Sequence, residues 1–525
     1  MRGLSEIAPF YLKEASDVFI RIALHDRDAK MREEARGALF KIWDNDIEKR
    51  LSKALSDRNS QVRASALRAL PPQAGSTFSH ILDALKDESA DVREAAVWRL
   101  RKFRLEETSS LLVELLLDKS GVVRNAAASV LGEMKARDAT DPLIALFLGD
   151  SEEYVRRTAE WALGMMEDVD IGSHLFLLFH GDVVQRRNSA FVLGALRSKE
   201  AFPALLDILK DEAPEIRSAS AWALGKIGMK EAIPALASYA DDLDREVRKM
   251  VAKSLGELKG EDAYRSLLPL LNDKDPEVRA MAVRGIGEVK IRKGEDHLIP
   301  LLNDSDPAVC FEAINALGEL QSKKGVPLIL KRLQEDSSES IRMYAAWALG
   351  RSGDPETIGG LVQHLIQHPG SSAAYYGKRA LQNFGIKEVL EKIKPYLENK
   401  DPLMRYGAVR LLGELKWCEG ISFLENLIED PDIHVREAVA LSLGKIGGLS
   451  VPDILIRMLS DSIPIVRFQV LEAFDMIRNP KTIPYLISAL SDPDFGVRIR
   501  ASEILDCFIF DPRVRSALQE FKETD

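Results

Sequence analysis

The chain has 525 residues, of which 46% are hydrophobic and 29% are charged, as in an ordinary folded protein. Its 72 Lys and Arg residues stand against 82 Asp and Glu residues, and the net charge of −10 disfavours a uniformly basic nucleic-acid binder. The three cysteines are too few for a disulfide framework and indicate a reducing, cytoplasmic compartment. Because no signal peptide and no apolar run of about 20 residues is present, we expect no membrane association.

A segment of about 31 residues recurs along the whole chain. Its signature is an arginine followed seven residues later by a leucine, as in DVREAAVWRL and EIRSASAWALG. The fifteen intervals between successive segments are each 30 to 32 residues long, which indicates a repeat array. We number the repeats one to sixteen by the residue at the arginine position, the anchor: Arg32, Arg63, Arg93, Arg124, Arg156, Arg186, Arg217, Arg248, Arg279, Cys310, Arg342, Ala374, Arg405, Arg436, Arg467 and Arg498.

Each repeat predicts two helices. The first is an apolar stretch such as FPALLDIL, and the second carries the anchor. A proline suited to a first helical turn precedes the anchor by three residues at Pro214, Pro276, Pro307, Pro402 and Pro464. Asp275, Asp306 and Asp401 occupy the N-cap position before three of these prolines. No segment alternates with the period of a strand, so the sequence predicts an all-α protein.

An aspartate also recurs six residues before the anchor in thirteen of the sixteen repeats. The exceptions are His180, His368 and Asn399. A carboxylate in each turn between helices and a guanidinium at each second-helix start can pair between neighbouring repeats. We expect this Asp–Arg ladder to be structural, because a catalytic pair is not needed a dozen times.

The repeat reads roughly D-x-x-x-x-V-R-x-x-A-A-x-A-L-G, and its glycine, eight residues after the anchor, is present in ten repeats. This pattern closely resembles the HEAT-like repeat family, in particular the short subtype named after phycobilisome lyases. The resemblance implies an α-solenoid of about sixteen two-helix repeats, with the second helices lining the concave face. It does not specify a function, because many unrelated scaffolds use the same repeat.

No linker interrupts the period, so we predict one continuous array over residues 1–525. Residues 1–44 are expected to form an N-terminal capping repeat, residues 45–479 the central repeats, and residues 480–525 the last repeat with a polar closing helix. Repeat twelve, within residues 330–385, lacks both ladder residues and the glycine. We expect it to be either a bend or a binding site.

The sequence contains no motif typical of an enzyme or of a cofactor site. HEAT-like deoxyhypusine hydroxylases hold iron with His-Glu dipeptides, and this chain has none. His364 and His368 are four residues apart, but they lack the glutamate of a zinc-protease motif. No phosphate-binding loop and no nucleophile elbow occurs. We therefore predict a protein that is not an enzyme and has no metal or cofactor, and we interpret Cys310 as one lost rung of the ladder.

The second helices have a constant face and a variable face. At 100° per residue, the residue before the anchor and those three and seven after it share the constant, core-facing side. Positions one, two, five and nine after the anchor lie opposite, and on a solenoid such a variable face is where partners bind. Four of the six tryptophans occupy position five, and we expect these rings to be accessible to solvent. The predicted partner-binding residues are Arg157, Trp161, Phe191, Trp222, Lys253, Arg284, Phe311, Tyr344, Trp347, Tyr375, Tyr376, Arg379, Tyr406 and Arg410.

The variable face is more basic than the chain as a whole. In repeats five to thirteen, positions one, two and five carry seven basic residues against Glu312 alone, whereas position nine is acidic on balance. An acidic or mixed-charge protein segment therefore fits this face better than a nucleic-acid backbone, which calls for a more continuous basic track.

Three functions follow from these observations. The leading prediction is a non-catalytic scaffold or adaptor that binds a partner protein or peptide in its concave groove. The alternative is a pigment-protein auxiliary, because IRMYAAWALGR, residues 341–351, is similar to the aromatic repeat motif of bilin lyases and phycobilisome-degradation proteins. In that case Arg379 or Arg410 would pair with the propionates of a tetrapyrrole. A further alternative resembles the HEAT-like alkylpurine glycosylases and binds nucleic acid, which the acidic total disfavours.

Overall fold

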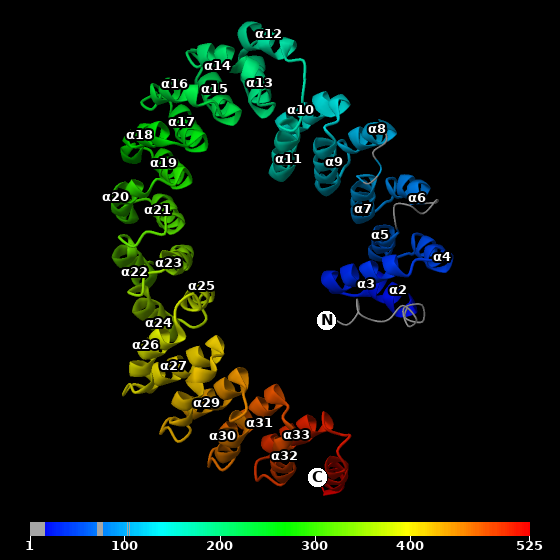
Figure 1. Ribbon diagram of the computed structural model, residues 1–525, viewed down its shortest axis with the longest axis vertical. Helices are drawn as coiled ribbons and strands as arrows, with labels where there is room; N and C mark the ends of the chain where they lie inside the picture. Colours follow the sequence, from blue (N-terminus) through cyan, green and yellow to red (C-terminus); the bar gives the residue numbers. More distant parts are fainter. Residues whose placement is uncertain (1–15, 71–76, 102, 104–105, 525) are drawn as a thin grey trace. The chain divides into compact units, whose positions relative to one another are not determined.

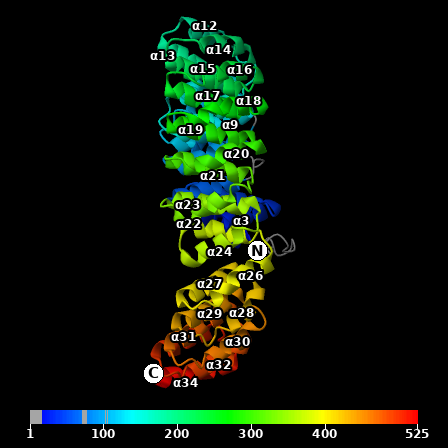
Figure 2. The same cartoon turned by 90° about the vertical axis from the view of Figure 1, so that its left-hand side faces the viewer.

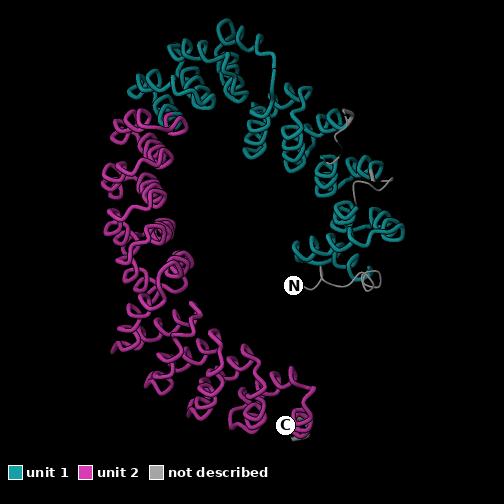
Figure 3. Tube along the Cα trace, in the orientation of Figure 1, with its two compact units in different colours: residues 1–254 teal, residues 255–525 magenta. Residues whose placement is uncertain are grey.

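The computed structural model describes residues 16–70, 77–101, 103 and 106–524. These residues form α-helices and short 3-10 helices and contain no strand, which confirms the all-α prediction. They make up two compact units, residues 1–254 and 255–525, and the boundary falls within α17, Arg245–Leu258 (Figure 3). Residues 1–15 of the predicted capping repeat lie outside the described residues. Whether the repeats form one uninterrupted array depends on how unit 2 continues from unit 1, so that expectation stays a prediction.

Unit 1 begins with two helices that pack tightly on each other, α2 and α3, and continues as successive helix pairs. Its helices are α2 (Ser16–His25), α3 (Ala29–Lys41), α4 (Asn45–Ala54), α5 (Ser60–Ala69), α6 (Thr77–Ala84), α7 (Ala90–Leu100), α8 (Glu106–Leu115), α9 (Gly121–Met134), η1 (Arg137–Ala139), α10 (Thr140–Gly149), α11 (Glu153–Leu163), α12 (Gly172–His180), α13 (Val183–Ala195), η2 (Lys199–Ala201), α14 (Phe202–Ile208), α15 (Pro214–Ile227), η3 (Lys230–Ala232) and α16 (Ile233–Ala237).

Unit 2 continues the same alternation to the end of the chain, where the predicted closing helix is present as α34. Its helices are α18 (Glu261–Leu267), η4 (Pro269–Asn272), α19 (Pro276–Val289), η5 (Arg292–Gly294), α20 (Glu295–Leu298), η6 (Ile299–Asn303), α21 (Pro307–Glu319), α22 (Val326–Glu335), α23 (Glu339–Ser352), α24 (Thr357–Gln367), α25 (Ser372–Leu381), α26 (Ile386–Leu397), α27 (Pro402–Leu415), η7 (Cys418–Gly420), α28 (Ile421–Glu425), α29 (Ile433–Ile446), α30 (Val451–Met458), α31 (Pro464–Ile477), η8 (Pro480–Thr482), α32 (Ile483–Ala489), α33 (Phe495–Asp506) and α34 (Pro512–Thr524).

Within each unit the anchor-bearing second helices line the inner side of the curve, and the first helices lie outside them (Figure 1). In unit 2 the second helices α19, α21, α23, α27, α29 and α31 follow one another in chain order in both views (Figures 1 and 2). The constant positions are buried as expected. In α19, for example, Val278, Ala282 and Ile286 are fully enclosed between neighbouring helices.

Local sequence sets where the second helices begin. The five prolines three residues before an anchor each open their helix, in α15, α19, α21, α27 and α31. Proline fits there because the first turn of a helix has no use for its missing N–H group. The side chains of Asp275, Asp306 and Asp401 accept hydrogen bonds from backbone N–H groups of the first turn, so the predicted N-caps are confirmed.

The repeated glycine lets neighbouring second helices approach closely. A Cβ on Gly194 would lie 2.6 Å from Cα of Ala223, and a Cβ on Gly444 would lie 2.8 Å from Cα of Ala473. Both distances are shorter than any ordinary carbon–carbon contact. The glycine is therefore required wherever the residue six positions after the next anchor packs directly on it.

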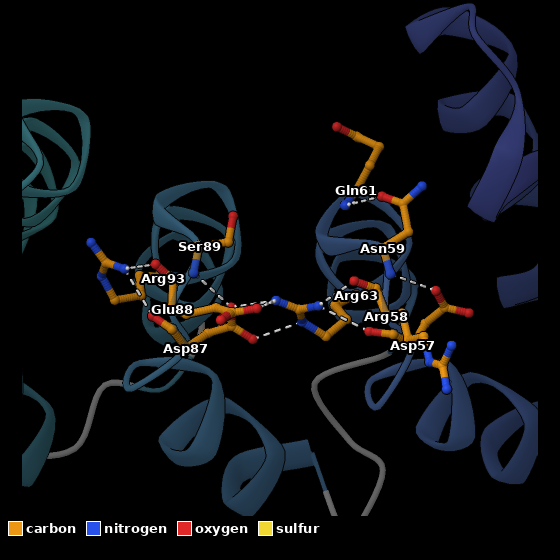
Figure 4. A network of polar contacts seen from close by, with 9 residues as sticks. All are labelled: Asp57, Arg58, Asn59, Gln61, Arg63, Asp87, Glu88, Ser89 and Arg93. Carbon is orange, nitrogen blue, oxygen red and sulfur yellow. Dashed lines mark hydrogen bonds and ion pairs between the residues drawn. The ribbon is translucent and has the colours of Figure 1, made fainter.

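The Asp–Arg ladder forms between neighbouring repeats. Anchors that pair with the ladder aspartate of the following repeat include those of Arg63–Asp87, Arg93–Asp118, Arg124–Asp150, Arg186–Asp211, Arg217–Asp242, Arg279–Asp304, Arg405–Asp430, Arg436–Asp461 and Arg467–Asp492. Figure 4 shows the rung at Arg63, whose Nε lies 2.8 Å and whose Nη2 lies 2.7 Å from the carboxylate of Asp87. Its Nη1 donates to the carbonyl oxygen of Asp57 in its own turn, so this rung ties two turns together.

The pairing lowers the pKa of Asp304, a typical ladder carboxylate. The hydrogen bonds from Arg279 hold the pKa of Asp304 below its ordinary value, although burial opposes this shift. The same carboxylate accepts the backbone N–H of Asp306, which shapes the turn before α21. A ladder aspartate thus serves its own turn and the preceding repeat at once.

Two rungs that lack an arginine are resolved differently. Where Cys310 replaces the anchor, Asp336 takes its guanidinium from Arg332 on α22 instead, at 3.2 Å. Where Ala374 replaces the anchor, the ladder position of the next repeat is Asn399, which keeps the turn hydrogen bond to the backbone N–H of Asp401. The carboxylate Asp336 is retained where Arg332 supplies a cation, and the ladder position after Ala374 is the neutral Asn399.

Repeat twelve departs from the standard stacking. Its first helix, α24, contacts α27 of repeat thirteen as well as its own partner α25. The reason is Gly407, where a Cβ would lie 2.7 Å from the carbonyl oxygen of Ile366. The loss of the ladder residues here thus coincides with a change in which helices meet.

Candidate functional site

The stacking of unit 1 is loosest between α11 and α13. These two second helices contact each other far less than α9 with α11 or α13 with α15, and Figure 1 shows α13 standing apart from α11. Two repeat features fail at this point. The ladder aspartate is replaced by His180, and the nearest atom to a Cβ on Gly164 would be the carbonyl oxygen of Ala195, at 3.3 Å, instead of a helix Cα atom.

Apolar side chains are exposed around this loose junction. Phe176 and Phe179 on α12 and Val183 and Val184 on α13 are all exposed, as is Trp161 on α11, whose ring is 42% exposed. Solvent-exposed apolar residues are ordinary when scattered, but a cluster beside a pocket marks a binding surface.

Aromatic side chains from three helices meet beside the junction. Phe147 on α10 stacks on Trp222 of α15 with ring centroids 6.0 Å apart, and Phe191 on α13 meets the same indole edge-on at 5.2 Å. Phe147 and Trp222 belong to repeats five and seven. The aromatic contact therefore bridges repeats that are not sequence neighbours.

A pocket of about 640 Å³ opens over these rings, and we call it the wedge pocket. Its volume is typical of small-molecule sites. It is lined by Phe147, Leu148, Glu153, Arg156, Arg157, Glu160, Arg187, Asn188, Phe191, Pro214, Glu215, Ser218, Trp222, Asp244, Glu246, Met250 and Lys253.

Several charges at the wedge pocket neutralise one another. Glu153 pairs with Arg157 at 2.7 Å, and Glu160 pairs with Lys226 of α15 at 2.9 Å, which joins repeats five and seven a second time. The amine of Lys226 also lies 5.5 Å from the centroid of the Trp222 ring. These carboxylates are therefore satisfied by the protein itself.

Three cations of the pocket, Arg156, Arg187 and Lys253, have no carboxylate partner among the described residues. The guanidinium of Arg187 donates to Oδ1 of Asn188, at 3.1 and 3.3 Å, which is a neutral acceptor. Lys253, at position five of α17, lines the pocket without an ion pair to any described residue. An apolar aromatic floor beneath unpaired cations is suited to a flat, anionic ligand.

The structure brings four of the five predicted residues of unit 1 together, since Arg157, Phe191, Trp222 and Lys253 all line the wedge pocket. Trp161 lies on α11 outside this lining. The expectation that the position-five tryptophans are accessible is wrong for Trp222, which is 5% exposed. Its ring is covered by the two phenylalanines and packs against Gly194 of the preceding repeat.

In unit 2 the first predicted residues pack on one another. The rings of Phe311 and Tyr344 meet edge-on at 4.3 Å, and Tyr344 in turn meets Trp347 at 6.2 Å. Arg351 lies 5.7 Å from the centroid of the Trp347 ring. Trp347 is half-buried, because it packs on Gly318 as Trp222 packs on Gly194.

Arg284 is neutralised by Glu312, the acidic residue of the variable face, so its charge is not available to a partner without displacement. The hydrogen bond that Arg284 donates to the Glu312 carboxylate raises the pKa of the Arg284 guanidinium. Lys249 is likewise paired, with Glu246 at 2.8 Å. Ion pairs within the protein thus neutralise part of the positive charge that the sequence predicts for the variable face.

The remaining predicted residues form tyrosine–arginine pairs. Arg379 lies 6.0 Å from the ring centroid of Tyr375, which also meets Tyr376 edge-on at 5.3 Å. Arg410 lies 5.7 Å from the ring centroid of Tyr406. Ring contacts therefore join the predicted cluster of repeats ten to thirteen in three groups.

Sequence reasoning missed Phe147 and Arg156 as members of a site, and it counted Arg187 among the basic residues of the variable face without selecting it as a site residue. Phe147 lies on a first helix, which the comparison of second helices did not include. Arg156 was assigned to the ladder. The signal that could have found it was His180, because a rung without its aspartate leaves an arginine unclaimed.

The described part of the chain holds no group of three or more His, Cys, Asp or Glu side chains that could bind a metal ion. No helix within it is long and apolar enough to cross a membrane.

One curated relative shares a local match with this chain. It is the bilin biosynthesis protein MpeU of Synechococcus sp. strain WH8020, which is 38% identical over 109 residues. The match covers 20% of this chain and 37% of the relative, so the chain spans well under half of that protein's length.

Solved structures of similar architecture are much more distant in sequence. Importin beta, crystallised in an ammonium sulfate condition, is 13% identical with a TM-score of 0.40, and the alignment covers 98% of this chain and 86% of that one. Yeast importin-beta, Kap95p, is 14% identical with a TM-score of 0.36, and the alignment covers 98% of this chain and 80% of that one.

The family model of HEAT repeats matches residues 78–164, 175–245, 237–296, 295–375 and 390–475. These segments together make up well over half of the chain, and they follow the helix pairs that the 31-residue period predicts. The resemblance drawn from the repeat pattern is thereby confirmed, and the chain belongs to the HEAT repeat family.

Proposed function

We propose that this chain is a binding protein in bilin metabolism that holds a bilin, free or attached to a protein, in the wedge pocket. The observation that carries the proposal is the 38% identity over 109 residues to a bilin biosynthesis protein. Of the functions predicted from the sequence, the comparisons therefore favour the pigment-protein auxiliary over the general scaffold. A role in binding, without catalysis, is part of the proposal.

The chemistry of the wedge pocket supports a bilin as the ligand. A bilin is a flat conjugated tetrapyrrole with two propionate groups. Phe147 and Phe191, which pack on the buried Trp222 ring, offer aromatic surface for the conjugated system, and Arg187 and Lys253 offer cations for the propionates. The sequence pattern favours Arg379 or Arg410 as the partner of the propionates, but these two arginines are stacked on tyrosines in unit 2.

The test is a titration of the protein with biliverdin, followed by visible absorbance and by quenching of tryptophan fluorescence. We expect saturable binding with one site per chain and a red shift or sharpening of the long-wavelength band, because contact with aromatic side chains restricts the conformers of the pigment. Phe191→Ala removes part of the aromatic floor and should weaken binding by about tenfold, the effect of a central hot-spot residue.

A matched control is Phe495→Ala, because this exposed phenylalanine lies on α33 in unit 2. It should bind biliverdin as the unaltered protein does. Absence of a saturable spectral change, or an equal loss in both variants, would remove the proposal.

A second candidate function, the binding of a protein partner, is favoured by the exposed rings of unit 2. Tyr375 is 56% exposed, and its stacked neighbour Arg379 has no ion pair with any described residue. Tyrosine and arginine are the residue types that dominate interface hot spots. Capture of a defined protein by the full chain, lost on Tyr375→Ala and Arg379→Ala together, would support this function. Unchanged capture by that double variant would contradict the assignment of this surface.

A further inference from the structure

We call a rung closed where the anchor arginine pairs with the ladder aspartate of the next repeat. In every closed rung named above except Arg186–Asp211, the guanidinium also donates to a backbone carbonyl oxygen of its own turn. In the rung at Arg124, Nη1 donates to the carbonyl oxygen of Asp118 at 2.8 Å. Nε and Nη2 each donate to one carboxylate oxygen of Asp150, at 2.6 and 2.8 Å, and we call this bidentate pair of donors the fork. The first contact sets the orientation of the guanidinium, and the fork faces the following repeat.

Arg156 keeps the first half of this arrangement and lacks the second. Its Nη1 donates to the carbonyl oxygens of Asp150 and Ser151, at 2.6 and 3.2 Å, as in a closed rung. The position that would supply the carboxylate is His180, whose ring lies against Phe176 with centroids 4.7 Å apart. Among the described residues no carboxylate pairs with Arg156.

The unpaired donors of Arg156 lie at the wedge pocket, because Arg156 is one of the residues that line this pocket. The only acids near it on α11, Glu153 and Glu160, are already paired with Arg157 and Lys226. A planar guanidinium binds a carboxylate through two parallel hydrogen bonds, which lysine cannot reproduce. The backbone carbonyls of the ladder turn thus orient the guanidinium of Arg156, a lining residue of the pocket, so that it can bind a carboxylate.

We propose that Arg156 is the residue of the wedge pocket that binds a carboxylate of the ligand, in the place that the ladder aspartate occupies in every closed rung. The replacement of that aspartate by His180 is what makes the site available. This inference rests on the proposed function and deepens it, since it assigns one propionate of the bilin to Arg156. The second propionate is then left to Arg187 or Lys253 across the junction.

The assignment predicts that the pocket requires a free acid. Biliverdin should bind more tightly than its dimethyl ester, which has the same conjugated system and no carboxylate. Removal of the fork should reduce this preference to the part that the second propionate contributes through Arg187 or Lys253. A double-mutant cycle over protein and ligand therefore isolates the interaction.

The experiment measures biliverdin and its dimethyl ester against the unaltered full chain and Arg156→Ala, with thermal unfolding of each protein. We expect Arg156→Ala to weaken biliverdin by about tenfold or more, as for a charged bidentate pair, and to change the ester little. Arg156→Lys should recover only part of the loss. The melting temperature should change little, because no ladder carboxylate loses its partner.

Two matched variants separate binding from stability. Arg93→Ala breaks a closed rung elsewhere in unit 1, and it should lower the melting temperature while leaving biliverdin affinity within about twofold. Arg342→Ala alters the corresponding open rung in unit 2, where His368 replaces the aspartate and Nη1 donates to the carbonyl oxygen of Asp336. It should change neither quantity.

The outcomes distinguish this inference from the proposed function. Biliverdin bound equally well by Arg156→Ala and by the unaltered protein would overturn the role of Arg156 and leave the function standing. If biliverdin does not bind at all, the proposed function fails, and 8-anilinonaphthalene-1-sulfonate, an aromatic anion, tests the fork by itself. Fluorescence of that probe lowered by Arg156→Ala supports an anion site, and unchanged fluorescence overturns it.

Discussion

At the scale of single residues, the contribution of a ladder ion pair to stability depends on its burial and on the additional hydrogen bonds that its carboxylate accepts. The carboxylate of Asp304 accepts two hydrogen bonds from Arg279, at 2.7 and 2.8 Å, and one from the backbone N–H of Asp306. Both side chains are largely buried. Such a pair costs desolvation to form, and its removal is more harmful than its presence is helpful, because a lone charge is left behind.

Arg279→Ala should therefore lower the free energy of unfolding by about 3 kcal/mol, the cost of stranding a buried carboxylate. Chemical denaturation of the full chain measures the change. Lys324→Ala is the control, since the pair of Lys324 with Asp296 is exposed and should contribute far less than a buried rung. Equal effects of the two substitutions would show that the rung is an ordinary surface pair.

Burial also makes one histidine a source of pH dependence. His364 is 2% exposed, and burial, followed by the nearby His368 and Arg342, lowers its pKa to about 4. The unfolded chain binds a proton at this residue from about pH 6.5 downward, and the folded chain does so only near pH 4. Stability is therefore fully present above pH 6.5 and falls as the pH drops from 6.5 to 4.

His364→Gln should remove this component, which amounts to about 2 kcal/mol between pH 7 and pH 5. The measurement is the difference in unfolding free energy between those two pH values, compared with the unaltered protein. His434→Gln changes an exposed histidine and should leave the difference as it is. A pH dependence that His364→Gln does not reduce would contradict the buried, neutral state of this ring.

At the scale of elements, helix packing is decided by the glycine at the contact between successive second helices. Gly444 lies against the backbone of Ala473, so a side chain there must push two helices apart. Gly37, in the middle of α3, has open space around it and only weakens its helix. The same residue type therefore has opposite roles at the two positions.

Gly444→Ala should destabilise the chain by about 2 kcal/mol, as overpacking does, whereas Gly37→Ala should stabilise it by up to about 1 kcal/mol through better helix propensity. Both values are read from chemical denaturation. A stabilising Gly444→Ala would show that α29 and α31 tolerate a wider spacing.

The elements themselves could be predicted from the sequence, because sixteen copies of one pattern reinforce each other. The prolines, the Asp N-caps and the buried Val, Ala and Leu positions are set by local rules that do not depend on the rest of the chain. Which rings become exposed was not predictable in this way. Trp161 and Trp222 occupy the same register, yet one is exposed and the other is covered by Phe147, a residue two repeats away.

At the scale of the whole molecule, the candidate site is a place where the repeat rule is broken. The wedge pocket depends on a loose junction between α11 and α13, and this spacing results from tertiary packing that a one-dimensional period does not encode. The sequence does mark the place, through His180 in the ladder. In a repeat protein, departures from the consensus are thus the first positions to inspect for function.

The most direct test of the central claim compares two double variants in biliverdin binding. Arg187→Ala with Lys253→Ala removes two cations of the wedge pocket, and Arg379→Ala with Arg410→Ala removes the stacked cations of unit 2. We expect the first double variant to weaken binding by about 30-fold or more and the second to leave it within about twofold. Loss of binding in the second variant but not in the first would contradict the wedge pocket as the bilin site.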